Sequence, residues 1–240
     1  SGVASMGAPL NWDSQLRLDD YLDAQGIAAE VLFPNTVPPF YPSVVLTAPG
    51  PRSPREYELR FAGLQAHNRW LADFCRQAPD RRAAFAQIFL DDVDDAIAEV
   101  RWAKEAGLHG VLLPGDHVLK MANLYYPRYE PLWATCVALD LPVHRHAAAP
   151  TESFYEGGKA SQLVAFVEIQ FYTARAVSHL IFSGVFERHP ELKFVTTEIA
   201  GASELVGPTV AELQTKLPAG ARPKYPEETC FALFREVVHV

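Results

Sequence analysis

The chain has 240 residues, a net charge of −8 and three widely spaced cysteines. Its length allows one large α/β domain or two small ones, and 49% hydrophobic with 21% charged residues is ordinary for a globular protein. Because the charge is negative and no Lys/Arg cluster occurs, nucleic acid is not expected as a partner. No apolar run reaches membrane-spanning length, and the cysteines are typical of reduced thiols, so we expect a cytoplasmic protein.

Strand-like and helix-like segments alternate along the chain. In chain order, the pattern predicts a helix over residues 16–25, a strand over 29–33, a helix over 54–77, a strand over 83–90, a helix over 91–106, a strand over 110–113, a helix over 129–139, a strand over 141–146, a helix over 162–186, a strand over 193–198 and a helix over 203–216. Five strand–helix repeats without a clear linker indicate one parallel, right-handed α/β domain covering residues 1–240. That is five-eighths of a (β/α)8 barrel.

Two polar features of this pattern have structural interpretations. Asn68 interrupts the apolar stripe of the helix over 54–77. A buried Asn must be hydrogen-bonded, so we expect it to tie a neighbouring loop to the barrel wall. The acidic run 91–95 resembles a metal site, but acids in the first turn of a helix, followed by Gly107 beyond its end, are typical of ordinary helix capping.

His146 and Glu198 each end a predicted strand. The carboxyl ends of parallel strands carry the chemistry of α/β barrels, so this pair indicates a metal or acid–base site. The alternative is structural: a packed histidine, and a glutamate that caps the next helix. His144 points to the same face as His146 but lies about 7 Å further from the barrel mouth, where it would add a ligand or simply pack.

Further residues are candidates for substrate binding. Asn35 follows a predicted strand, and Phe154 and Tyr155 lie in the loop over 147–162, which can fold over the site as a lid. The helix over 162–186 is apolar nearly all round, as expected of a helix covered by a second subunit, so we predict a homodimer. Arg175 belongs to a polar stripe on that helix, either as a bonded structural residue or as a contact for a substrate carboxylate.

Four strings carry a family resemblance: His67-Asn68-Arg69-Trp70-Leu71-Ala72-Asp73-Phe74, Trp102-Ala103-Lys104-Glu105-Ala106-Gly107-Leu108, Tyr129-Glu130-Pro131-Leu132-Trp133, and Leu180-Ile181-Phe182-Ser183-Gly184-Val185-Phe186-Glu187-Arg188-His189-Pro190. In order and spacing they resemble the amidohydrolase-related family, which includes aminocarboxymuconate-semialdehyde decarboxylase and related aromatic-acid decarboxylases. The resemblance covers about residues 15–206.

The resemblance implies a metal-dependent (β/α)8 TIM barrel. His146 matches the metal-binding histidine that ends the family's fifth strand, and Glu198 stands where its decarboxylases carry an active-site histidine. The family's metal-binding motifs on the first strand and after the last strand have no counterpart here, so we expect the first and last strands to be missing from this chain, as in the ordered remainder of something longer.

These observations lead to a first hypothesis with two alternatives. The first is a metal-dependent hydrolase acting on a C–O or C–N bond of a small organic substrate, with His146 as ligand to a divalent metal, expected to be Zn²⁺, and Glu198 as catalytic base. Glutamate in place of histidine favours hydrolysis because it removes a group that can be cationic at neutral pH. The alternatives are a decarboxylase of a small aromatic or unsaturated acid, and a catalytically degenerate barrel that binds a partner.

Overall fold

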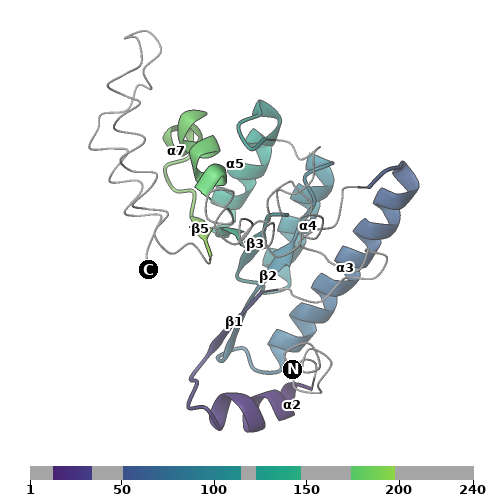
Figure 1. Ribbon diagram of the computed structural model, residues 1–240, viewed down its shortest axis with the longest axis vertical. Coiled ribbons are helices and arrows are strands. Elements are labelled where there is room, and N and C mark those ends of the chain that lie inside the picture. Colours follow the sequence, from purple (N-terminus) through teal and green to yellow (C-terminus); the bar gives the residue numbers. More distant parts are fainter. Residues whose placement is uncertain (1–12, 34–50, 115–122, 147–173, 198–240) are drawn as a thin grey trace, which may run out of the picture.

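The computed structural model describes residues 13–33, 51–114, 123–146 and 174–197. These residues form a parallel sheet of five strands whose spatial order, β1-β2-β3-β4-β5, is also their order in the chain (Figure 1). The strands are β1 Glu30–Leu32, β2 Arg82–Gln87, β3 Gly110–Leu112, β4 Val143–Arg145 and β5 Phe194–Thr196. Parallel strands joined in sequence through helices form part of a (β/α)8 barrel, as predicted.

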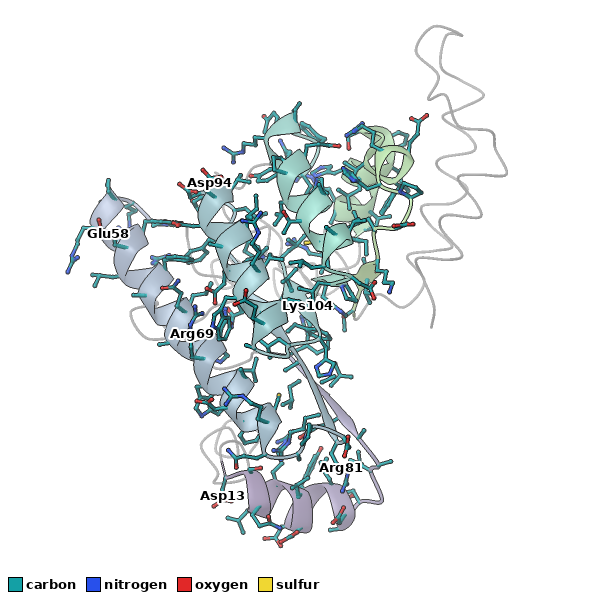
Figure 2. The ribbon with its side chains drawn as sticks, turned by 180° about the vertical axis from the view of Figure 1, so that it is seen from behind. Asp13, Glu58, Arg69, Arg81, Asp94 and Lys104 are labelled. Atoms are coloured by element: carbon teal, nitrogen blue, oxygen red, sulfur yellow. The ribbon has the colours of Figure 1, made fainter. Side chains whose placement is uncertain are left out.

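The helices alternate with the strands (Figure 1). They are α2 Ser14–Leu16 with the π-helix η2 Arg17–Asp23, α3 Pro54–Arg76, α4 Val93–Glu105, the 3₁₀ turn η4 Pro127–Tyr129, α5 Glu130–Ala138 and α7 Val185–Arg188, and residues 174–182 are also helical. Figure 2 shows Glu58 and Asp94, each near the start of its helix, at one end of the sheet, and Asp13 and Arg81 at the other. The helices therefore start at the carboxyl edge of the sheet, as a right-handed crossover requires.

The acidic run caps helix α4. The carboxylate of Asp92 accepts hydrogen bonds from the backbone N–H groups of Asp94 and Asp95, at 2.9 and 3.1 Å. Asp95 also accepts a hydrogen bond of 2.7 Å from the hydroxyl of Tyr57 on α3. Gly107 ends the helix with φ of +81°, a conformation that glycine adopts without strain. The helix-capping interpretation of this run is thus confirmed.

The hydrophobic core lies between the sheet and the helices. Its residues on the strands, or directly after them, alternate along the chain and are Ala84, Ala86, Ile88, Val111, Leu113, Val143 and Phe194. Because successive strand residues point to opposite faces, the residues between them face away from the helices. We call this second surface the inner face; it carries Phe85, Gln87, Gly110, His144 and His146.

Two predicted elements end earlier in the structure than in the sequence pattern. The strand predicted over 83–90 pairs with its neighbours only as far as Gln87. The helix predicted over 162–186 is helical over 174–182 and then turns at Gly184, whose φ is +74°, before the short helix α7. Its described part carries the exposed Arg175, which belongs to the predicted polar stripe, and the apolar Phe182, which is 45% exposed. The helix predicted over 203–216 lies outside the described residues.

Nothing in the described ranges resembles a membrane-spanning helix in both length and hydropathy.

Candidate active site

His146 directly follows β4, at the carboxyl edge of the sheet. Val143 on the same strand belongs to the core under the helices, so His144 and His146 point to the inner face. In parallel α/β barrels this edge and this face carry the active site. The local fold therefore presents His146 where the sequence predicted it.

Aromatic rings link His146 to the neighbouring strands. The ring of Phe33, which follows β1, lies 5.1 Å from the ring of His146 and 5.0 Å from that of Phe85 on β2. Phe85 in turn stacks on His144 with 3.7 Å between ring centroids. These residues form a continuous aromatic wall across three strands, against which a planar ligand can pack.

Gly110 makes this wall geometrically possible. A Cβ at this position of β3 would lie 2.7 Å from the carbonyl oxygen of Pro142, 3.0 Å from Phe85 and 3.1 Å from His144. Only glycine leaves room for the two rings to stack across β3. Phe33, Phe85 and Gly110 were not among the predicted site residues; the alternation of residues along each strand was the signal that could have placed them on the inner face.

His144 is a neutral imidazole in this environment. The residue is 8% exposed, and burial lowers its pKa to about 4. Within the described ranges, its Nδ1 has no hydrogen-bond partner. His144 thus packs against Phe85 on the inner face, and a ligand role for it stays a prediction.

A metal needs more ligands than the described residues supply. Catalytic zinc sites use three protein ligands and an open position. In residues 13–33, 51–114, 123–146 and 174–197, no group of three or more His, Cys, Asp or Glu side chains could hold a metal ion. His146 supplies one donor in a suitable place, and the described residues alone do not complete a site.

The other predicted site residues are distributed differently. Arg175 is exposed; its guanidinium donates to the Asn123 side chain at 3.1 Å and to His179 Nε2 at 3.2 Å. These contacts fit the bonded polar stripe, and the substrate contact stays a prediction. The described structure does not bring Arg175 into the aromatic wall around His146. Four further candidates lie outside the described residues: Asn35, Phe154, Tyr155 and Glu198.

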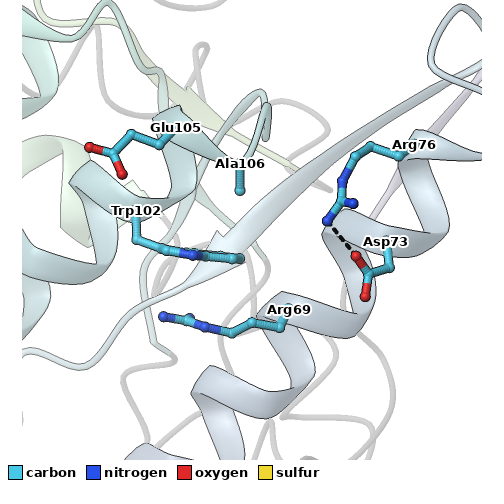
Figure 3. Close-up of a pocket in the computed structure, with 6 residues that line it drawn as sticks. All are labelled: Arg69, Asp73, Arg76, Trp102, Glu105 and Ala106. Atoms are coloured by element: carbon cyan, nitrogen blue, oxygen red, sulfur yellow. Dashed lines mark hydrogen bonds and ion pairs between the residues drawn. The ribbon is translucent and has the colours of Figure 1, made fainter.

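One cavity of about 440 Å³ lies elsewhere, between the outer surfaces of α3 and α4 (Figure 3). Its lining side chains already bind each other: Arg69 lies flat against the Trp102 indole, 3.6 Å from the ring centroid, and pairs with Glu99. Arg76 pairs with Asp73. These residues come from the carboxyl-terminal halves of both helices, away from the carboxyl edge of the sheet, so the cavity is not part of the candidate active site.

Comparisons with known proteins agree with this fold. A curated relative, gamma-resorcylate decarboxylase from Rhodococcus jostii (strain RHA1), is 32% identical over 198 residues, which are 77% of this chain and 58% of the relative. The crystal structure of 2,6-dihydroxybenzoate decarboxylase complexed with 2,6-dihydroxybenzoate matches with a TM-score of 0.60 and 25% identity, covering 89% of this chain and 63% of that chain.

A third match shows similarity of fold alone. It is dihydroxybenzoic acid decarboxylase from Polaromonas sp. JS666 with bound manganese and the inhibitor 2-nitroresorcinol, with a TM-score of 0.60, 23% identity, and coverage of 89% of this chain and 61% of that chain. This chain thus spans about three-fifths of the length of these proteins. The curated relative and the first of the two structures are both named decarboxylases, which favours the decarboxylase alternative over the first, hydrolytic hypothesis.

The family itself is established by a match over most of the sequence. The family model described as amidohydrolase matches residues 27–225, which include all five strands of the sheet. The predicted family and the predicted partial barrel are both confirmed, and the chain belongs to the amidohydrolase family.

Proposed function

We propose that this chain acts as a metal-dependent decarboxylase of a small hydroxylated aromatic acid. The observation that carries the proposal is His146 at the carboxyl end of β4, beside an aromatic wall, in a chain whose curated relatives are named gamma-resorcylate decarboxylase. The aromatic wall suits a planar ring, and the position of His146 suits the polar end of the same molecule.

The proposed reaction breaks one carbon–carbon bond. The bond between the aromatic ring carbon and the carboxylate carbon breaks, and CO₂ leaves. The electron pair stays on the ring carbon, which takes up a proton, so the net reaction consumes one proton and needs no oxidant or reductant. We propose Glu198, two residues beyond β5, as the group that holds this proton or acts as its hydrogen-bond partner. A glutamate needs a raised pKa to donate it at neutral pH.

A divalent metal is part of the proposal. When bound, it would polarise a carboxylate or hydroxyl oxygen of the substrate as a Lewis acid. His146 would provide one ligand, and the others would come from outside the described residues. The manganese in the related Polaromonas structure supports a divalent metal; zinc, the metal expected from the sequence, has no such support.

Four residues are proposed as substrate contacts: Asn35, Phe154, Tyr155 and Arg175. Asn35 follows β1 closely in the chain, and Phe154 and Tyr155 belong to the loop that follows β4. Loops after strands surround the mouth of a barrel. Arg175 would pair with the substrate carboxylate, as guanidinium groups do.

We also propose that the enzyme is a cytoplasmic homodimer. Phe182 is 45% exposed on the helix over residues 174–182, and an exposed aromatic side chain suits a subunit interface. Cys75 and Cys136 are buried free thiols, as expected in a reducing compartment. Light scattering of the purified full chain tests the dimer.

The test of the function is turnover by the full chain. We would incubate it with 2,6-dihydroxybenzoate in the presence of Mn²⁺ or Zn²⁺ and measure by chromatography how much of the acid is decarboxylated. A panel of esters and amides would be assayed for hydrolysis in parallel. We expect decarboxylation that chelation abolishes and Mn²⁺ restores. Hydrolysis of an ester or amide without decarboxylation would restore the hydrolase hypothesis, and inactivity on every compound would favour the degenerate barrel.

A matched pair of histidine variants tests the site. His146→Ala should lose bound metal and at least about 100-fold in kcat/KM, whereas His109→Ala, at an exposed position just before β3, should keep both. Each variant must unfold at the wild-type temperature. An active, metal-replete His146→Ala enzyme would rule out the ligand role.

A further inference from the structure

Gln87, the last residue of β2, carries a buried carboxamide on the inner face. Its neighbours Ala86 and Ile88 belong to the core under the helices, and successive strand residues point to opposite faces. The side chain therefore points into the partial barrel. Gln87 as a whole is 8% exposed, so this amide is largely removed from solvent at the carboxyl edge of the sheet.

Gln87 lies in one row with His144. The ladder pairs Gln87 with Leu112, and Leu112 with His144. Paired residues of parallel strands point to the same face, so these three side chains form a row across β2, β3 and β4. His146 lies two residues further along β4, a rise of about 7 Å. The row therefore lies deeper in the partial barrel than His146.

The amide nitrogen of Gln87 has an unused hydrogen-bonding capacity. Its Nε2 is buried and has no hydrogen-bond partner among the residues that the structure describes. A buried donor without a partner is destabilising, and buried polar groups are almost always paired. Barrel enzymes bind substrate at this edge and face of the sheet, so the Nε2 of Gln87 is available to an oxygen of a ligand.

The backbone of Gln87 is held in place from the other side of the sheet. Asn68 on α3 accepts a hydrogen bond from the Gln87 N–H at 3.0 Å and donates one to the Gln87 carbonyl at 2.8 Å. The Asn68 amide also donates to the buried carboxylate of Glu99 at 2.9 Å. This bonding fixes the point from which the side chain of Gln87 extends, as a specificity contact requires.

We propose that Gln87 recognises a ring hydroxyl of the substrate. Its Nε2 would donate a hydrogen bond to the hydroxyl oxygen of an aromatic acid whose ring packs on Phe33 and Phe85. This inference rests on the proposed function and deepens it. The metal near His146 would bind the acidic group of the substrate, and Gln87 would select hydroxylated rings over unsubstituted ones. Sites that bind a hydroxyl reject analogues without it, because the polar group of the protein is then left unpaired.

The test compares two probes that cannot be decarboxylated. The full chain, loaded with Mn²⁺, is titrated calorimetrically with 2-nitroresorcinol, which has two ring hydroxyls, and with 2-nitrophenol, which has one. Gln87→Leu keeps the approximate shape of the side chain and removes its donor. Gln65→Leu is the matched control, because Gln65 lies on α3 near Glu99 and away from the inner face.

We expect wild type and Gln65→Leu to bind 2-nitroresorcinol more tightly than 2-nitrophenol. In Gln87→Leu this preference should fall roughly 3- to 10-fold, as expected for one neutral hydrogen bond. The melting temperature should stay equal or rise, because an unpaired buried donor is removed. A merely structural role for Gln87 would instead lower the melting temperature and leave the preference unchanged.

Other outcomes separate the two proposals. If wild type prefers 2-nitroresorcinol and Gln87→Leu keeps that preference, or weakens both probes equally, the role of Gln87 is overturned and the proposed function stands. If wild type binds neither probe and does not decarboxylate 2,6-dihydroxybenzoate, the proposed function falls, and the role of Gln87 falls with it.

Discussion

The side chain of Asn68 hydrogen-bonds to both the backbone N–H and the backbone carbonyl of Gln87, at 3.0 and 2.8 Å. Within the described residues, β1 pairs with β2 only as far as Ala84. Beyond that point Asn68 takes the place of a neighbouring strand for Gln87. The prediction that Asn68 is hydrogen-bonded is therefore confirmed, but its partner is the end of strand β2 and not a neighbouring loop.

Removing this amide should destabilise the protein strongly. Asn68→Ala leaves two buried backbone groups of Gln87 and the carboxylate of Glu99 without this partner, so we expect the free energy of unfolding to fall by about 2–4 kcal/mol. Chemical denaturation measures it. Gln65→Ala, which loses only a long 3.4 Å contact with Glu99, should change stability by less than about 0.5 kcal/mol. Equal effects of the two variants would contradict the role assigned to Asn68.

A methyl group at Gly110 should also destabilise the fold. Gly110→Ala places a Cβ against the Pro142 carbonyl, Phe85 and His144, which should cost about 1–3 kcal/mol as overpacking and separate the stacked rings. Gly107→Asn is the comparison, since nothing lies within 4 Å of a Cβ there and Asn tolerates a positive φ. Thermal unfolding of both variants checks the prediction, which fails if Gly110→Ala is as stable as wild type.

Stability should decrease with acidification because of His67. Burial lowers the pKa of this histidine on α3 to about 4, whereas the unfolded chain binds the same proton with a pKa of about 6.5. Between these values the unfolded state holds more protons, so unfolding becomes easier as the pH falls from about 6.5 to 4, by up to about 3 kcal/mol. Above pH 6.5 the free energy of unfolding is no longer lowered by protonation of His67.

A variant isolates the share of His67 in that dependence. His144 titrates over the same range, so the difference between wild type and His67→Leu is the quantity to measure, by urea unfolding at several pH values. His67→Leu should lose less stability than wild type between pH 6.5 and 4. Parallel curves for the two proteins would contradict the assignment.

Arg175→Ala distinguishes the two interpretations of the polar stripe. If Arg175 pairs with the substrate carboxylate, KM should rise roughly tenfold while kcat stays unchanged. Arg101→Ala, on the exposed surface of α4, should leave both constants as in wild type. An unchanged KM in Arg175→Ala would show that its contacts with Asn123 and His179 are its whole role. Steady-state kinetics with 2,6-dihydroxybenzoate provide the values.

The alternation of apolar segments predicted the five strands, their order and most helices, because each element buries a regular face. Its errors occur where hydrophobicity continues past the end of regular hydrogen bonding. Phe89 and Leu90 are buried although β2 ends at Gln87, so an apolar run overstates the strand. Val185 and Phe186 are buried beyond the turn at Gly184, so the same pattern hides the end of a helix.

A site residue was predictable where its position follows from one strand alone. His146 could be placed from its position after a single strand. Alternation places Phe33, Phe85 and His144 on one face, but it could not predict that their rings are in contact, because they come from three strands and meet only through the register of the ladder. Gln87 was missed for a further reason: its burial and its unpaired nitrogen are properties of the packed structure and leave no trace in composition or periodicity.

The order of the strands has a consequence for how the protein is made. Each described strand pairs with the one that precedes it in the chain, so the surface that receives a new strand already exists when that strand leaves the ribosome. Each new strand can therefore pair as soon as it emerges, without waiting for a later strand of the described sheet. The sheet can therefore grow in the direction of synthesis. Strands β1 and β2 would form first, and β3, β4 and β5 would then add in turn, with His146 following β4.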